Sequence, residues 1–349
     1  TTPERPVIND PRENTLMTHM ASGSETGHQD PAFNTSVRRE QVKTITVLYS
    51  VKDAPEDAVD VSQQQNGKVL AWTVPNGELY DLYLAAEGGI YAPADSRYLF
   101  GLFINVERIE FNDAFFTDNV ENARAMFYKD EKLVEMDVSG FKTSNMTNMS
   151  FMFSYCNMLE RLDVSGFDTA NVTDMNTMFQ RCESLRTLDV SGFDTAKVTN
   201  MEYMFNGVKY VPVLDVSHFD TSLVTNMQYM FNDCCAVKEL EVSGFNTEQV
   251  TLMRSMFKNC AALETLDVSE FETGKVTDMG RMFEGCGKLK QLDISGFDTG
   301  KLTTMDSMFS GCAALQSVQI SPEINTVRVT DMSYLFYECA ALVKVDVSG

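Results

Sequence analysis

The chain has 349 residues, of which 44% are hydrophobic and 22% charged, a balance typical of a folded protein. Its formal net charge of −22 argues against nucleic acid or an anionic membrane as a partner, because both require a basic surface. No apolar run approaches the roughly 18–20 residues that span a bilayer, so we expect no membrane insertion of this fragment.

The first 94 residues divide into two segments of different character. Residues 1–39 are rich in Pro, Ser, Thr, Gly and Asn, which is typical of a linker or an extended arm. Residues 40–94 are expected to form a β-rich module, with a strand over 42–49 and a hairpin whose turn is Pro75-Asn76-Gly77. We expect this module to cap the open end of the array that follows.

Residues 95–349 repeat a unit of 26 residues. The segment Leu-Asp-Val-Ser-Gly-Phe at 162–167 has counterparts that start at Leu188, Leu214, Leu240, Leu266 and Leu292. A Met-Phe pair recurs at the same period from Met126 to Met308. Fixed-period similarity of this kind predicts a solenoid, in which each unit contacts its neighbours. The chain stops part-way through a motif at Gly349, so we expect that the array is truncated at its C-terminal end.

Within a unit the apolar period changes. Met175, Met178, Phe179, Cys182 and Leu185 follow helical spacing, whereas Leu188 and Val190 alternate with polar residues as in a strand with one buried face. One short helix and one short strand per unit predict an α/β solenoid. It would be a leucine-rich-repeat array of about ten units, with a parallel concave sheet and the helices on the convex side.

The cysteines and methionines follow the same repeat. Seven of the eight cysteines occupy one repeat position on the apolar face, so we expect buried free thiols in preference to disulfides or a metal site. The recurring methionines are expected to fill the core.

The repeated string Leu-Asp-Val-Ser-Gly-Phe-Asp-Thr, followed by Met-Phe and Cys, resembles the BspA-like leucine-rich-repeat surface proteins of bacteria over residues 95–349. The resemblance implies an extracellular or cell-surface location and no enzymatic activity. It also implies adhesion to a protein or glycan on host cells, in the extracellular matrix or on other bacteria.

Sequence signals for catalysis are nearly absent. The chain has three histidines, two of them in the presumed arm, so no triad or histidine metal cluster can be assembled. No cofactor-binding motif is present, and we expect the protein to bind no cofactor. A glycan-active enzyme remains a remote alternative, because carboxylates are abundant.

A column of aspartates, among them Asp163, Asp189 and Asp215, is expected to project from the concave sheet. Like charges at this spacing repel each other, so the column needs compensation. A row of weak Ca²⁺ sites would supply it. Hydrogen bonds from neighbouring hydroxyls and backbone amides would also do so, and we favour this structural role because the residue recurs in every unit.

Exceptions to the repeat are the best candidates for a binding site. The unit from 207 to 218 departs most, with Tyr210 and Val213 where its neighbours have Ser184 and Thr187. Drift in a tolerant scaffold would also explain such exceptions. Tyr residues are enriched in binding hot spots. The candidate binding residues are these two, the outward tyrosines and members of a varied concave column: Tyr203, Tyr210, Val213, Tyr229, Arg161, Thr187 and Glu239.

The sequence therefore predicts a non-enzymatic, surface-displayed or secreted binding module of the adhesin type. The alternative is a structural spacer that holds a neighbouring domain away from the cell.

Overall fold

The computed structural model describes residues 11–18 and 26–346 of the chain. Contacts within the chain group it into two compact units, residues 1–171 (unit 1) and residues 172–349 (unit 2). Neither boundary expected from the sequence, after residue 39 or after residue 94, coincides with this division.

The N-terminal part of unit 1 is built on a mixed six-stranded sheet of order β2-β3-β4-β1-β6-β8. Its strands are β1 (Val42–Leu48), β2 (Val59–Asp60), β3 (Leu70–Asn76), β4 (Leu79–Ala85), β6 (Arg108–Glu110) and β8 (Glu135–Met136). The expected hairpin is present, with β3 and β4 paired antiparallel, but its turn is Gly77–Glu78, because Pro75 and Asn76 belong to β3. The φ of 68° at Gly77 suits glycine. Strands expected over residues 40–94 are thus present, in a sheet that extends beyond this range.

This sheet continues directly into the repeats of unit 1. Strand β1 pairs in parallel with β6, and β6 pairs in parallel with β8, so two repeat strands extend the module's own sheet. A second, two-stranded sheet joins β5 (Ile90–Tyr91) to β7 (Phe115–Phe116). Backbone hydrogen bonding is therefore continuous from the module into the first repeat strands.

Part of the expected linker is folded onto unit 1. The segment contains four short 3₁₀ helices, η1 (Pro11–Asn14), η2 (Gly27–Gln29), η3 (Ala32–Asn34) and η4 (Arg39–Gln41). Leu16 and Phe33 are fully buried, and so is Arg39, whose Nη1 donates to the carbonyl oxygens of Tyr98 and Gly101. The structure therefore differs from the linker expectation over residues 11–18 and 26–39. Residues 1–10 and 19–25 lie outside the described residues.

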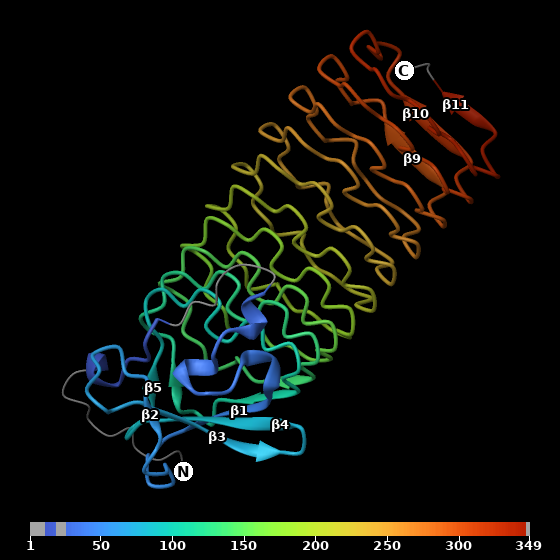
Figure 1. The fold of residues 1–349 in the computed structure, drawn as a ribbon. Coiled ribbons are helices and arrows are strands. Elements are labelled where there is room, and N and C mark those ends of the chain that lie inside the picture. Colours follow the sequence, from blue (N-terminus) through green and yellow to red (C-terminus); the bar gives the residue numbers. More distant parts are fainter. Residues whose placement is uncertain (1–10, 19–25, 347–349) are drawn as a thin grey trace. The chain divides into compact units, whose positions relative to one another are not determined.

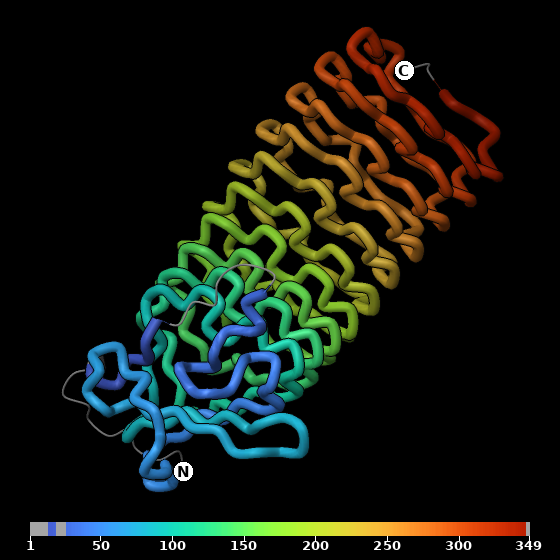
Figure 2. Tube along the Cα trace, viewed as in Figure 1, coloured from blue at the N-terminus to red at the C-terminus, as the bar shows by residue number. Residues whose placement is uncertain are grey.

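The repeats form coils that stack through a ladder of phenylalanine rings. In unit 1 the rings of Phe100, Phe127 and Phe153 are parallel, with centroids 5.8 and 5.6 Å apart. Unit 2 continues the pattern, with centroids mostly 5.7–5.8 Å apart, at Phe179, Phe205, Phe231, Phe257, Phe283, Phe309 and Phe336. The three ladder rings of unit 1 and the seven of unit 2 each mark one coil, which gives the ten coils expected from the repeat. Figures 1 and 2 show the coils of unit 2 side by side, from green to red.

The predicted helix in each repeat is wrong, and the described residues contain no α-helix. In the coil that contains Met178, Thr177 and Arg181 have φ values of 62° and 55°, which a right-handed helix does not allow. Their N–H groups, with that of Phe179, donate to the next coil at Glu202, Asn206 and Met204. The residues between them make i→i−3 turns, such as Met178 N–H to Met175 O.

Helical spacing nevertheless predicted the buried residues correctly. Met175, Met178, Phe179, Cys182 and Leu185 are all buried. A coil that alternates tight turns with bonds to its neighbour places residues inward at the same intervals as a helix does. Periodicity therefore reports which side chains are buried without reporting where the backbone hydrogen bonds go.

The predicted parallel sheet forms in part. In unit 2 the ladder bonds of a sheet join β9 (Gln291–Ile294), β10 (Ser317–Ile320) and β11 (Lys344–Asp346), all parallel. In earlier coils of unit 2 the corresponding residues, such as Leu188 and Val190, keep the in-out alternation without belonging to a described strand. A threonine column bonds these coils together: Thr277 N–H and Oγ1, for example, both donate to Thr251 O.

Candidate functional site

Two of the predicted tyrosines form a stacked pair on unit 2. The rings of Tyr203 and Tyr229 lie 4.5 Å apart with an interplanar angle of 3°, and both are half-buried. Both residues have left-handed backbone, with φ of 56° and 57°. This backbone, and not the helix that the sequence suggested, turns the two rings away from the Met-Phe core.

Tyr210 and Val213 are exposed, as expected, with 53% and 73% of their surface open to solvent. Val213 and Thr187 line one shallow depression of about 290 Å³, together with Pro212, Arg186, Asp189 and Asp215. Its exposed apolar residues are Val213 and Pro212. Two residues of the prediction, from adjacent coils, are therefore brought together.

Arg186 joins Tyr210 to this depression. Its guanidinium carbon lies 4.6 Å from the centroid of the Tyr210 ring, within cation–π distance. Sequence reasoning missed Arg186, although it lies in the preceding repeat only two residues beyond the position equivalent to Tyr210. We call the surface formed by Arg186, Thr187, Tyr210, Pro212 and Val213 the irregular-coil surface.

Glu239 lies elsewhere on unit 2, in a larger depression of about 610 Å³. Thr265 and Gln291 of the same varied column line it as well. Its charged residues are four carboxylates and one lysine: Glu239, Glu241, Glu264, Asp267 and Lys290. Arg161 is exposed and belongs to unit 1, so it is not grouped with any of the other predicted residues.

The repeats match a protein family over most of the chain. The family is described as "Mycoplasma protein of unknown function, DUF285", and its model matches residues 98–212, 186–267, 208–322 and 260–348. The chain belongs to the DUF285 family. No curated protein and no solved structure matches the chain.

The aspartate column of these DUF285 repeats is stabilised by local hydrogen bonds. Asp189 Oδ1 accepts hydrogen bonds from the N–H and Oγ of Ser191, at 3.0 and 2.6 Å, and Asp163 and Asp215 bond Ser165 and Ser217 in the same way. The serine hydroxyl and amide hold the pKa of Asp189 below its usual range. Among the described residues, no three His, Cys, Asp or Glu side chains are grouped to hold a metal ion. The hydrogen bonds that the structural role of the column requires are thus present.

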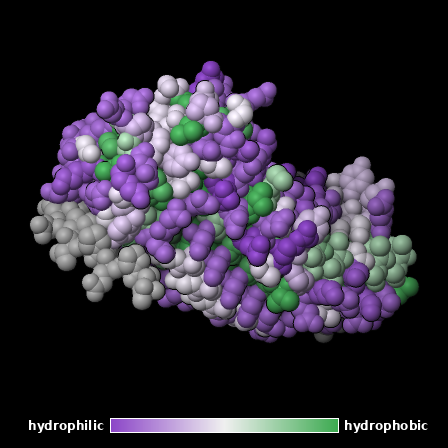
Figure 3. All heavy atoms as spheres, turned by 90° about the horizontal axis from the view of Figure 1, so that it is seen from below, coloured by the Kyte–Doolittle hydropathy of each residue, from purple (hydrophilic) through white to green (hydrophobic). Residues whose placement is uncertain are grey.

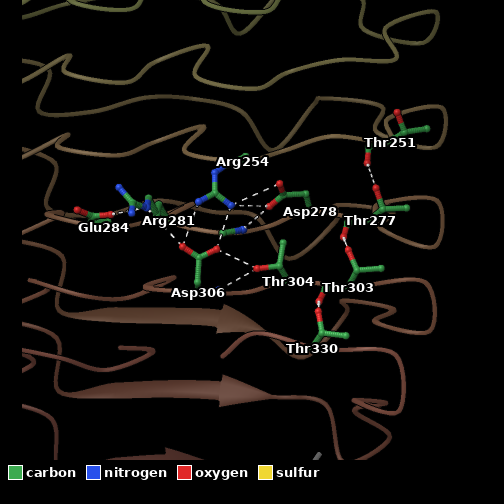
Figure 4. Close-up of polar contacts among 11 residues, drawn as sticks. Thr251, Arg254, Thr277, Asp278, Arg281, Glu284, Thr303, Thr304, Asp306 and Thr330 are labelled. Atoms are coloured by element: carbon green, nitrogen blue, oxygen red, sulfur yellow. Dashed lines mark hydrogen bonds and ion pairs between the residues drawn. The ribbon is translucent and has the colours of Figure 1, made fainter. Parts of the chain in front are cut away.

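A polar network that sequence reasoning missed spans three DUF285 coils of unit 2 (Figure 4). Arg254 donates from Nη1 and Nη2 to the two carboxylate oxygens of Asp306, at 2.9 and 3.0 Å, and Nη1 also donates to Asp278 at 3.2 Å. Arg281 Nε reaches Asp306 at 3.4 Å. The intervening coil contributes Gly280 beside the pair, where a side chain would block it. The 26-residue period by itself does not predict an ion pair between residues two repeats apart.

The face of this DUF285 protein that Figure 3 shows is largely hydrophilic. Figure 3 shows polar residues over most of the face in view, with apolar ones scattered among them. No helix among the described residues is long and apolar enough to cross a membrane. Exposed apolar residues such as Val213 are therefore local exceptions on the surface.

Proposed function

We propose that this protein is a non-enzymatic binding module of the adhesin type, displayed at a cell surface or secreted, that attaches to macromolecules of a host or of another cell. It would bind through the surface of its coils. The irregular-coil surface of unit 2 would form the contact.

The observation that carries the proposal is the exposure of Val213 beside Tyr210. The coil before it has Thr187 and Ser184 at the equivalent positions, so a polar residue serves the fold equally well there. Tyr210 and the arginine held on its ring are of the residue types that dominate binding hot spots. The exposed Val213 adds apolar surface next to them. Binding would bury this apolar surface and offset the cost of exposing it.

A resemblance supports the surface location. The repeated string of the DUF285 region resembles that of BspA-like bacterial surface proteins, whose role is adhesion. The acidic composition, with 50 Asp and Glu against 28 Lys and Arg, favours solubility and disfavours nucleic acid as a partner.

The test uses the whole chain and a variant that restores the regular repeat. Binding to immobilised extracellular-matrix proteins and to a host-cell glycan panel is measured for the wild type and for Tyr210→Ser/Val213→Thr. We expect the double variant to lose about 2 kcal/mol or more of binding free energy, near thirtyfold in affinity, if these residues are hot spots. Leu223→Gln is the matched control, because it removes an exposed apolar residue of unit 2 and installs the residue of the next coil, Gln249.

The outcomes separate the alternatives. Loss of binding in the double variant but not in Leu223→Gln supports the irregular-coil surface. Binding that survives both substitutions places the contact elsewhere. A wild-type chain that binds nothing in either panel would favour the spacer role.

A further inference from the structure

Four aromatic rings form a cluster on unit 1. Tyr128 lies at its centre, with ring centroids of Tyr98, Phe151 and Tyr155 each 6.0 Å away and nearly perpendicular to it. All four residues are half-buried, so part of each ring reaches the surface. Tyr98, Phe151 and Tyr155 have positive φ, the same backbone device that turns Tyr203 outward in unit 2.

Two cations rest on these rings. The guanidinium carbon of Arg124 lies 4.5 Å from the centroid of Phe151, and Lys129 Nζ lies 5.5 and 5.8 Å from the centroids of Tyr128 and Tyr155. Arg124 Nη1 donates to Ser150 Oγ at 3.0 Å. Within residues 11–18 and 26–346, neither cation forms an ion pair with a carboxylate.

The neighbouring Arg97 shows the contrast. Its Nη2 lies 2.8 Å from Asp95 Oδ2, so its charge is already neutralised within the fold. Arg124 and Lys129 are instead positioned by aromatic faces, which restrict the two side chains without cancelling their charge. A cation that is held in place and still unneutralised loses little conformational entropy when an anion binds it.

We propose that this aromatic–cationic patch, formed by Tyr98, Arg124, Tyr128, Lys129, Phe151 and Tyr155, binds an acidic glycan that carries carboxylate or sulfate groups. The guanidinium would bind the anionic group through charge-assisted hydrogen bonds, and the ammonium would bind a second charge. The phenol hydroxyls both donate and accept, as the hydroxyl groups of a sugar require, whereas an acidic peptide would leave much of that capacity unused.

The charge of the whole chain does not prevent this binding. At physiological ionic strength the screening length is about 8 Å, so carboxylates on distant coils act weakly at the patch. Arg124 and Lys129 are the charged residues of the patch itself and act on a bound anion at short range. The patch belongs to unit 1, and the inference does not rest on the irregular-coil surface of unit 2.

The test measures binding of the whole chain to three probes of matched length at physiological salt. The probes are a heparin oligosaccharide, which is sulfated, a hyaluronan oligosaccharide, which is carboxylated, and a neutral dextran oligosaccharide. We expect at least one of the two anionic glycans to bind and dextran not to bind. Which of the two binds distinguishes sulfate from carboxylate recognition.

The variants separate ring-held cations from general positive charge. Arg124→Gln/Lys129→Gln should weaken glycan binding about tenfold or more, because charge-assisted bonds are lost. Lys132→Gln/Lys142→Gln removes the same charge from exposed lysines of unit 1 and should leave the affinity within about twofold, as expected for charges whose effect is mainly screened. Thermal melting checks that both variants are folded.

Three results would overturn the proposal: no binding of either anionic glycan, equal losses in the two double variants, or polyglutamate that binds as tightly per charge as the glycan. The last result would identify an acidic protein as the partner. Tyr210→Ser/Val213→Thr should leave glycan binding at the patch intact, so that failure here and failure of the proposed function are told apart.

Discussion

Arg254 and Asp306 are 52 residues apart in the chain, and their side chains form a two-pronged ion pair across an entire intervening coil. The pair is possible because the intervening coil has Gly280 at the position where they meet. A Cβ at Gly280 would overlap both Arg254 Nη1 and Asp306 Oδ1. Three successive coils of unit 2 are thereby joined by side chains as well as by their backbones (Figure 4).

The first prediction is that Gly280→Ala destabilises unit 2 by about 2 kcal/mol, because it breaks charge-assisted hydrogen bonds between largely buried groups. Urea unfolding measures the change. Gly244→Ala is the control, since a Cβ there meets only Ser217 O, at an ordinary contact distance of 3.8 Å. If Gly280→Ala acts by breaking this ion pair, it should lower the stability only slightly further when Arg254→Gln has already removed the pair. Stability losses of the two substitutions that simply add in the double variant would refute this mechanism.

The second prediction concerns acid. Burial raises the pKa of Asp306, but hydrogen bonds from Arg254 and Thr304 outweigh it and the net shift is downward. A carboxyl whose pKa is lowered by folding stabilises the protein above its unfolded pKa, about 3.9, and loses this contribution as pH falls through the folded pKa. We therefore expect the wild type to exceed Asp306→Asn in stability at pH 7, and the difference to shrink below about pH 4.

Urea unfolding of both proteins at a series of pH values tests this dependence. Glu323→Gln, which neutralises an exposed carboxylate of unit 2, serves as the control. A stability difference between wild type and Asp306→Asn that stays constant from neutral pH into the acid range would contradict the assignment.

The third prediction concerns the phenylalanine ladder. Phe231 is fully buried, and its ring stacks on Phe205 and Phe257 with centroids 5.7 Å away on either side. Phe231→Ala should cost about 3–5 kcal/mol and, because coils are coupled only through neighbours, should split or broaden the melting transition. The exposed Val213→Ala should change stability by no more than about 0.5 kcal/mol. Equal melting curves for the two variants would refute the ladder as the core.

The fourth prediction concerns the thiols. None of the eight cysteines is in a disulfide, and six are buried, whereas Cys235 and Cys339 are half-buried. Buried ladder thiols donate to a carbonyl of the preceding coil, as Cys260 Sγ does to Phe231 O at 3.2 Å, and burial raises the pKa of Cys260 well above its ordinary value. A thiol reagent should therefore modify at most Cys235 and Cys339 in the folded protein and all eight cysteines after denaturation. A count that stays low in denaturant would reveal disulfides.

The repeat period decided most of what is regular in this protein. It gave the number of coils and the buried Met, Phe, Cys and Leu positions, because inward spacing is a property of the sequence alone. It also drew attention to Tyr210 and Val213, because these large residues stand where the preceding repeat has Ser184 and Thr187. The β hairpin around Gly77 followed equally from local turn chemistry, which needs no tertiary contact.

Only the tertiary structure decided how the backbone closes each coil. Met175, Met178 and Phe179 are spaced as in a helix, but the backbone around them donates hydrogen bonds to the next coil. This pattern of hydrogen bonds forms only where a neighbouring coil is present. The Arg254–Asp306 pair and the contact of Arg186 with Tyr210 could not be predicted from the sequence, because they too are contacts between coils. Contacts between coils depend on side chains that are 24 to 52 residues apart, and no local pattern records which of them will meet.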